Sequence, residues 1–161
     1  MSGDAGAGKT TALRHYAETN TGVIFVTANA CTTTATAVLG LICQQVGRQV
    51  PGRKAMLINT LVEQLTGSNR LIIIDEADHL SLDALQAVRN LNDLAGVGIV
   101  LSGNDKIYRQ MLAGRRSYEF DQLHTRIVVR KKVFNDYTVE EMKDITLRIA
   151  STRIFLEPVL V

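Results

Sequence analysis

The stretch GDAGAGKT, at residues 3–10, constrains this 161-residue chain more than any other feature. It matches the pattern G-x-x-x-x-G-K-[ST], whose glycines let successive backbone N–H groups wrap a chain of phosphates. The lysine of this pattern carries a positive charge to the outer phosphates, and the hydroxyl residue can ligate magnesium. A helix that starts directly after the loop points its positive N-terminal dipole at the same anion. The sequence therefore predicts a site for a nucleotide.

The pattern assigns the residues of this site by position. Lys9 is predicted to meet the phosphates, Thr10 to ligate magnesium and Thr11 to begin the following helix. The full set predicted to bind the nucleotide is Gly3, Asp4, Ala5, Gly6, Ala7, Gly8, Lys9, Thr10 and Thr11. Only Met1 and Ser2 precede the loop, so the hydrophobic strand from which such a loop normally extends is predicted to be missing. We therefore expect this chain to be a fragment or a truncated reading frame.

A second set of candidate residues follows the apolar run LIIID at residues 71–75, which reads as a buried parallel strand. Asp75 at the end of this strand can hold magnesium, and Glu76 can polarise the water that attacks the γ-phosphate. Asp78 and His79 are compatible with coupling hydrolysis to movement. For His79 we favour the simpler interpretation, a surface residue at a helix start.

A third strand, GIVLSG at residues 98–103, ends just before Asn104. Because neighbouring parallel strands end at the same edge of a sheet, the amide of Asn104 could orient the attacking water beside Glu76. VIFVTA at residues 23–28 reads as a further strand. Helical segments between these strands, at residues 9–19, 32–47 and 53–66, complete an alternating pattern. That alternation predicts an α/β fold in which helices cover both faces of a parallel sheet.

The most readable helix is SLDALQAVRNLNDLAG, which Ser81 can cap and Gly96 can end. Its predicted buried face consists of Ala84, Ala87, Val88, Leu91, Leu94 and Ala95. Residues 127–134 read as another strand, and residues 138 to about 151 as an amphipathic helix.

Composition limits the class of protein. No apolar run approaches the roughly 20 residues that a membrane-spanning helix needs, and no targeting segment precedes the glycine-rich loop. Cys31 and Cys43 lack the spacing of metal ligands and are too few for a disulfide framework. We expect both to be reduced thiols in a cytoplasmic protein without membrane contact.

The formal net charge of +2 conceals a local basic block. Between Lys106 and Lys132 the chain has eight basic residues and two acidic ones. The basic residues are Lys106, Arg109, Arg115, Arg116, Arg126, Arg130, Lys131 and Lys132. Such a block suits a phosphate-bearing partner, although a solvated basic face explains it equally well.

Several stretches together resemble the AAA+ ATPases of DNA transposition: GDAGAGKTTALRHYA, FVTA, LIIIDEADHLSLDALQAVRNLND, GIVLSGND and FDQLHTRI. The resemblance runs from residue 3 to about residue 150. The phosphate loop and acid pair are common to many ATPases, whereas DEADHLS to SGND and QLHTRI are more discriminating. The resemblance implies an α/β P-loop NTPase core of the AAA+ type at residues 1–135 and an incomplete helical lid at residues 136–161. It also implies ATP and Mg²⁺ as cofactors.

The resemblance implies a role for each matching residue. Lys9 would bind the phosphates, and Thr10 and Asp75 would bind magnesium. Glu76 would be the catalytic base, and Asn104 would be the first sensor. Arg126 would be the arginine finger that reaches a neighbouring subunit's nucleotide, with Arg115 and Arg116 as rivals. Arg148 and Arg153 are weak candidates for a second sensor.

The leading functional hypothesis is an ATPase that assembles as a ring or filament on double-stranded DNA when ATP is bound. It would assist a transposase by capturing target DNA and activating the enzyme. One alternative is a related ATPase of replication initiation or helicase loading, and another is a truncated, non-catalytic nucleotide-binding module. A helicase is disfavoured because the chain is too short for a second motor domain.

Overall fold

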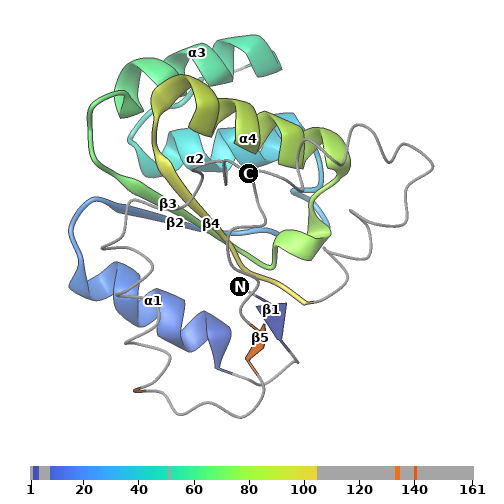
Figure 1. Cartoon of the computed structure of the whole chain (residues 1–161). Coiled ribbons are helices and arrows are strands. Elements are labelled where there is room, and N and C mark those ends of the chain that lie inside the picture. The colour runs from blue at the N-terminus through green and yellow to red at the C-terminus, as the bar shows by residue number, and fades with distance from the viewer. Residues whose placement is uncertain (1, 4–7, 51, 105–132, 135–139, 141–161) are drawn as a thin grey trace, which may run out of the picture.

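The computed structural model describes residues 2–3, 8–50, 52–104, 133–134 and 140. The chain order of its elements is shown in Figure 1. They are β1 (Ser2–Gly3), α1 (Lys9–Thr19), β2 (Val23–Thr27), α2 (Ala35–Gln45), α3 (Lys54–Leu65), β3 (Leu71–Asp75), the 3₁₀ helix η1 (Ala77–His79), α4 (Leu82–Ala95), β4 (Gly98–Leu101) and β5 (Val133–Phe134).

The strands β2, β3 and β4 form a parallel sheet in that order, which confirms the predicted strands and their direction. Phe25, Ile73 and Val100 lie in one row across the sheet. Helix α1 lies on one face, and α2, α3 and α4 lie together on the other (Figure 1). The prediction of an α/β sheet covered on both faces is therefore correct.

The central strand β3 is buried on both sides, which explains why its residues 71–74 are continuously apolar. Ile72 and Ile74 belong to the large core formed with α2, α3 and α4, whereas Ile73 packs with Leu13 of α1 and Val100 of β4. Strands between two layers of helix alternate between two apolar environments, so no polar face appears in their sequence. This burial fixes the strand that carries Asp75.

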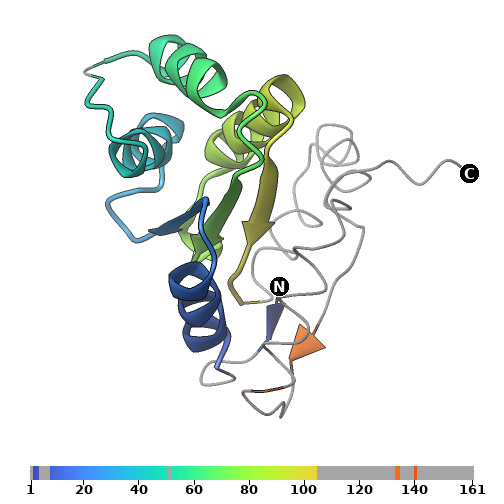
Figure 2. The ribbon, with the colours of Figure 1, turned by 90° about the vertical axis from the view of Figure 1, so that its left-hand side faces the viewer.

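The strand β1 is a departure from the sequence prediction, which has no strand ahead of the glycine-rich loop. Ser2 and Gly3 form a two-residue strand that pairs in parallel with Val133 and Phe134 of β5. The two short strands lie side by side in both views (Figure 1 and Figure 2). Backbone groups alone make this ladder, so a strand forms here without the apolar run that sequence patterns detect.

Two predictions near the C-terminus are only partly covered by the structure. Strand β5 falls within the predicted strand at residues 127–134, but residues 127–132 lie outside the described residues. The predicted helix at 138 to about 151 also lies outside them, apart from Glu140. The lid at residues 136–161 therefore stays a prediction.

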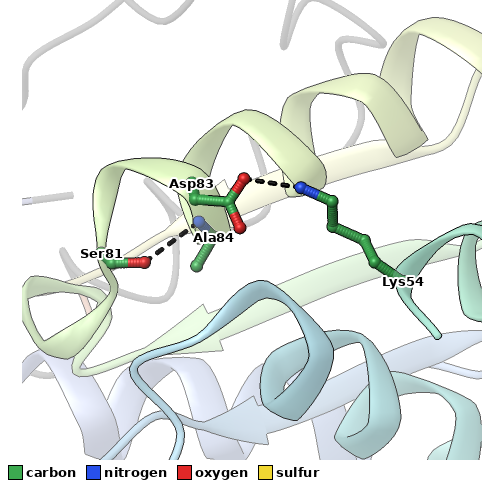
Figure 3. Close-up of polar contacts among 4 residues, drawn as sticks. All are labelled: Lys54, Ser81, Asp83 and Ala84. Atoms are coloured by element: carbon green, nitrogen blue, oxygen red, sulfur yellow. Dashed lines mark hydrogen bonds and ion pairs between the residues drawn. The ribbon is translucent and has the colours of Figure 1, made fainter. Parts of the chain in front are cut away.

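Helix α4 begins and ends as predicted. The Ser81 hydroxyl accepts a hydrogen bond from the N–H of Ala84 at 3.2 Å, and Gly96 ends the helix in a left-handed conformation with φ of 65°. Lys54 at the start of α3 contacts the carboxylate of Asp83 at 2.6 Å (Figure 3). Exposed ion pairs of this kind contribute about 0–1 kcal/mol, so the apolar contacts hold α3 against α4.

The predicted burial of Leu94 on α4 is wrong. Leu94 is 61% exposed, while Leu85, which the prediction omits, is buried. Helical spacing places Leu94 close to the direction of Ala87, which is buried. Spacing gives only the direction of a side chain, and burial also requires another element to cover that turn.

This difference predicts unequal costs for two leucines of α4. Leu91 is 0% exposed, so Leu91→Ala is expected to lower the free energy of unfolding by about 2–5 kcal/mol. Leu94→Ala removes the same atoms from an exposed position and should change it by no more than about 0.5 kcal/mol. Urea denaturation followed by circular dichroism measures both. Equal losses in the two variants would contradict this packing of α4.

The structure describes both cysteines and the helices that bear on membrane contact. Cys31 is exposed, Cys43 is buried, and both are free thiols. Burial raises the pKa of the Cys43 thiol, which keeps it in its unreactive protonated form. Within the described part of the chain, no helix combines the length and the apolar character needed to cross a membrane.

Candidate nucleotide site

The start of α1 forms one side of the candidate site. Gly8 adopts the left-handed conformation with φ of 74° and stands as the N-cap of α1, which begins at Lys9. The helix therefore confirms the predicted segment at residues 9–19, although it begins two residues before Thr11, the start that the loop pattern assigns. Lys9 and Thr10 consequently lie in the first turn, whose N–H groups have no partners within the helix and whose dipole favours an anion. The loop residues 4–7 lie outside the described residues.

The structure brings the two predicted magnesium ligands together from opposite sides of the site. The hydroxyl of Thr10 donates a hydrogen bond of 2.7 Å to Oδ2 of Asp75, across 65 residues of sequence. Asp75 is 2% exposed, and its backbone carbonyl accepts the N–H of Ala28 at 2.8 Å. A hydroxyl and a carboxylate are hard oxygen donors of the kind that magnesium prefers, so this pair fits the ion.

Glu76 differs from the adjacent Asp75 in its exposure and its backbone conformation. Its φ is 53°, a left-handed conformation that is uncommon for a residue other than glycine, and Glu76 is exposed where Asp75 is buried. Asp75 contacts Thr10, whereas Glu76 is exposed to solvent, and a carboxylate oxygen of Glu76 lies within 4.8 Å of one of Asp78. The left-handed conformation costs on the order of 1–3 kcal/mol and persists only where surrounding contacts hold it.

Asn104 lies at the predicted edge of the sheet, and its amide has a partner that the sequence analysis missed. Its Nδ2 donates to Oδ2 of Asp78 at 2.7 Å, and its backbone N–H donates to Oδ1 of the same carboxylate at 3.3 Å. Asp78 is only 8% exposed. The available sequence signal is the final aspartate of DEAD, for which the sequence suggests only a role in coupling.

His79 is exposed, as the simpler interpretation predicts. Among the described residues, the possible metal-ligand atoms of Glu76, Asp78 and His79 lie within 4.8 Å of one another. Both carboxylate oxygens of Asp78 already accept hydrogen bonds from Asn104. These hydrogen bonds account for the burial of Asp78 without a metal ion.

Several predicted functional residues lie outside the described residues. They are Asp4, Ala5, Gly6, Ala7, Arg115, Arg116, Arg126, Arg148 and Arg153, together with the basic block from Lys106 to Lys132. The arginine finger and the second sensor therefore stay predictions. The predicted site residues that the structure describes are Gly3, Gly8, Lys9, Thr10, Thr11, Asp75, Glu76 and Asn104, and the structure adds Asp78 as a partner of Asn104.

Comparison with known proteins supports the resemblance seen in the sequence. A family model described as an AAA domain matches residues 1–111. The chain is 36% identical over 132 residues to the ATP-dependent target DNA activator B of Escherichia phage Mu, which covers 81% of this chain and 42% of that protein. It is also 36% identical over 127 residues to the Mu-like prophage FluMu DNA transposition protein B of Haemophilus influenzae, covering 78% and 44%. The chain thus spans less than half the length of these relatives.

Proposed function

This chain belongs to the AAA domain family, and we propose on that basis that it binds and hydrolyses ATP with magnesium. The observation that carries the proposal is the hydrogen bond of 2.7 Å between Thr10 and Asp75. It joins the end of the phosphate-loop pattern to the acid strand, the two elements that a magnesium-dependent nucleotide site requires.

Each residue of the site has a proposed role. Lys9 attracts the outer phosphates, while Thr10 and Asp75 hold magnesium. When bound, magnesium neutralises charge on the phosphate oxygens. Glu76 is exposed at the same edge and accepts a proton from the attacking water. Asn104 provides a polar contact near that water or the γ-phosphate.

We also propose that the protein acts on double-stranded DNA in transposition, together with a transposase and as an ATP-dependent oligomer. The printed names of its relatives, a target DNA activator and a DNA transposition protein, favour transposition over replication initiation. The basic block from Lys106 to Lys132 supports contact with phosphates.

The described surface provides a second basic region. No aspartate or glutamate occurs between Glu18 and Glu63, and Arg48 and Arg53 within that interval are exposed. Exposed arginines attract the phosphates of the DNA backbone, although the carboxylate of Asp83 lies beside Lys54, the residue next to Arg53.

ATP-dependent DNA binding tests the transposition proposal. Fluorescence anisotropy with a labelled duplex is expected to show tighter binding with ATP than without nucleotide. Raising the salt concentration fourfold should weaken the complex by at least about tenfold, since phosphate contacts release counterions. Binding that is absent, or the same with and without ATP and insensitive to salt, would contradict the proposal.

A further inference from the structure

We propose that Asp78 is a positioning residue of the ATPase site, acting through Asn104 and through the turn that carries Glu76. The inference rests on the proposed ATPase function and adds a residue to it. Asp78 follows the acid pair by two positions, yet it is directed toward the end of β4 and away from Thr10's partner Asp75.

Asp78 holds the amide of Asn104 in one orientation. A carboxylate only accepts hydrogen bonds, so it selects the Nδ2 end of the amide and fixes which end faces away. The second hydrogen bond, from the backbone N–H of Asn104, anchors the main chain at the same carboxylate. Asp78 is largely removed from water, and hydrogen bonds to a charged group are stronger in such surroundings. The amide is therefore oriented before any nucleotide arrives.

Backbone contacts of the residues on both sides of Glu76 adjoin the contact between Asp78 and Asn104. The N–H of Ala77 donates to the carbonyl of Ser102 at 2.8 Å, next to the contact between Asp78 and Asn104. On the other side, the carbonyl of Asp75 accepts the N–H of Ala28 at 2.8 Å. These contacts hold the residues before and after Glu76, and so support its left-handed conformation.

Together these contacts join the end of β4 to residues 75–78, the acid segment. Residues 77 and 78 contact residues 102 and 104, so the backbone that carries Glu76 and the amide of Asn104 keep a fixed relation. Pre-oriented polar groups stabilise a transition state without the cost of reorganisation. Loss of Asp78 should therefore reduce turnover more than nucleotide affinity.

Kinetics of single and double variants test this role in the full chain. Asp78→Ala is expected to lower kcat for ATP hydrolysis by about 10- to 100-fold while the Kd for ATP changes less than about threefold. Asn104→Ala should have a similar effect. The double variant should be no slower than the slower single variant, because both remove the same arrangement. Unchanged kcat in Asp78→Ala, or effects that multiply in the double variant, would overturn the proposal.

An exchange of the two residues separates positioning from simple stabilisation. In the double variant Asp78→Asn with Asn104→Asp, the new amide at position 78 can donate to the new carboxylate, and its oxygen can accept the backbone N–H of residue 104. The melting temperature is therefore expected to return close to the wild-type value. Turnover should stay as low as in Asn104→Ala, because position 104 no longer has an amide.

The exchange also decides the case if Asp78→Ala does not fold. A folded exchange variant with wild-type turnover overturns the proposal by showing that the pair only stabilises the fold, whereas low turnover supports the need for an amide at position 104, the group that Asp78 orients. The wild-type chain separates this result from the proposed function. Absence of ATP hydrolysis by the wild type contradicts the ATPase proposal itself, whereas normal turnover in both wild type and Asp78→Ala contradicts only the role of Asp78.

Discussion

Glu76→Gln is expected to leave ATP bound and to lower its hydrolysis by about 100-fold or more, the range attributed to a positioned general base. Glutamine keeps the size of the side chain but cannot take a proton from water. Glu76 is exposed, so the substitution removes no buried contact and the fold is expected to be retained. Phosphate release under single-turnover conditions measures the chemical step, and calorimetry measures ATP affinity.

A matched control for this variant is Glu63→Gln on α3, which makes the same chemical change at another exposed position. It should hydrolyse ATP at the wild-type rate. Equal rates in wild type and Glu76→Gln would instead indicate background hydrolysis and favour a non-catalytic nucleotide-binding module.

Lys9→Ala should have the largest effect on nucleotide binding, with the Kd for ATP rising by about 100-fold. Lys9 stands in the first turn of α1, directly after Gly8, where the loop pattern places a charge on the outer phosphates. Loss of charge-assisted contacts worth about 1.5–3 kcal/mol gives roughly 10- to 100-fold, and a buried phosphate adds to that cost. Calorimetry with ATP and magnesium measures the change.

Thermal denaturation provides a second measurement of the same variant. A ligand at about 100 times its Kd stabilises the folded state by about 2.7 kcal/mol, so ATP should raise the melting temperature of the wild type but not of Lys9→Ala. Lys54→Ala is the matched control, since Lys54 pairs with Asp83 on the surface, and its affinity for ATP should be unchanged. Wild-type ATP affinity in Lys9→Ala would show that the glycine-rich loop does not bind the phosphates.

The sequence predicts the parts of the fold that depend on repeating patterns. The strands around Ile24, Ile73 and Val100 are apolar because helices cover both faces, and that environment leaves a clear run of β-branched residues. Ser81 and Gly96 mark the ends of α4 because capping depends on local chemistry. These features require only neighbours in sequence, so sequence alone predicts them.

Sequence patterns do not predict features that depend on contacts between residues distant in the sequence. The left-handed Glu76 has no local signal, since such a conformation is uncommon outside glycine and is held here by the ends of β2 and β4. Pairing of Asp78 with Asn104 depends on how η1 packs beside the end of β4. Exposure of Leu94 depends on which element covers the last turn of α4. Each requires the assembled sheet.

Helix α4 gives the acid segment a mechanical connection to a remote part of the surface. It starts four residues after Asp78, and its 14 residues span about 21 Å at 1.5 Å per residue. A tilt of about 5° at its first turn would displace its far end by about 2 Å. The helix would therefore convert a small movement beside the nucleotide into a larger one at its C-terminal end. Leu94, an exposed apolar side chain, lies in the last turn of α4 and would move with that end.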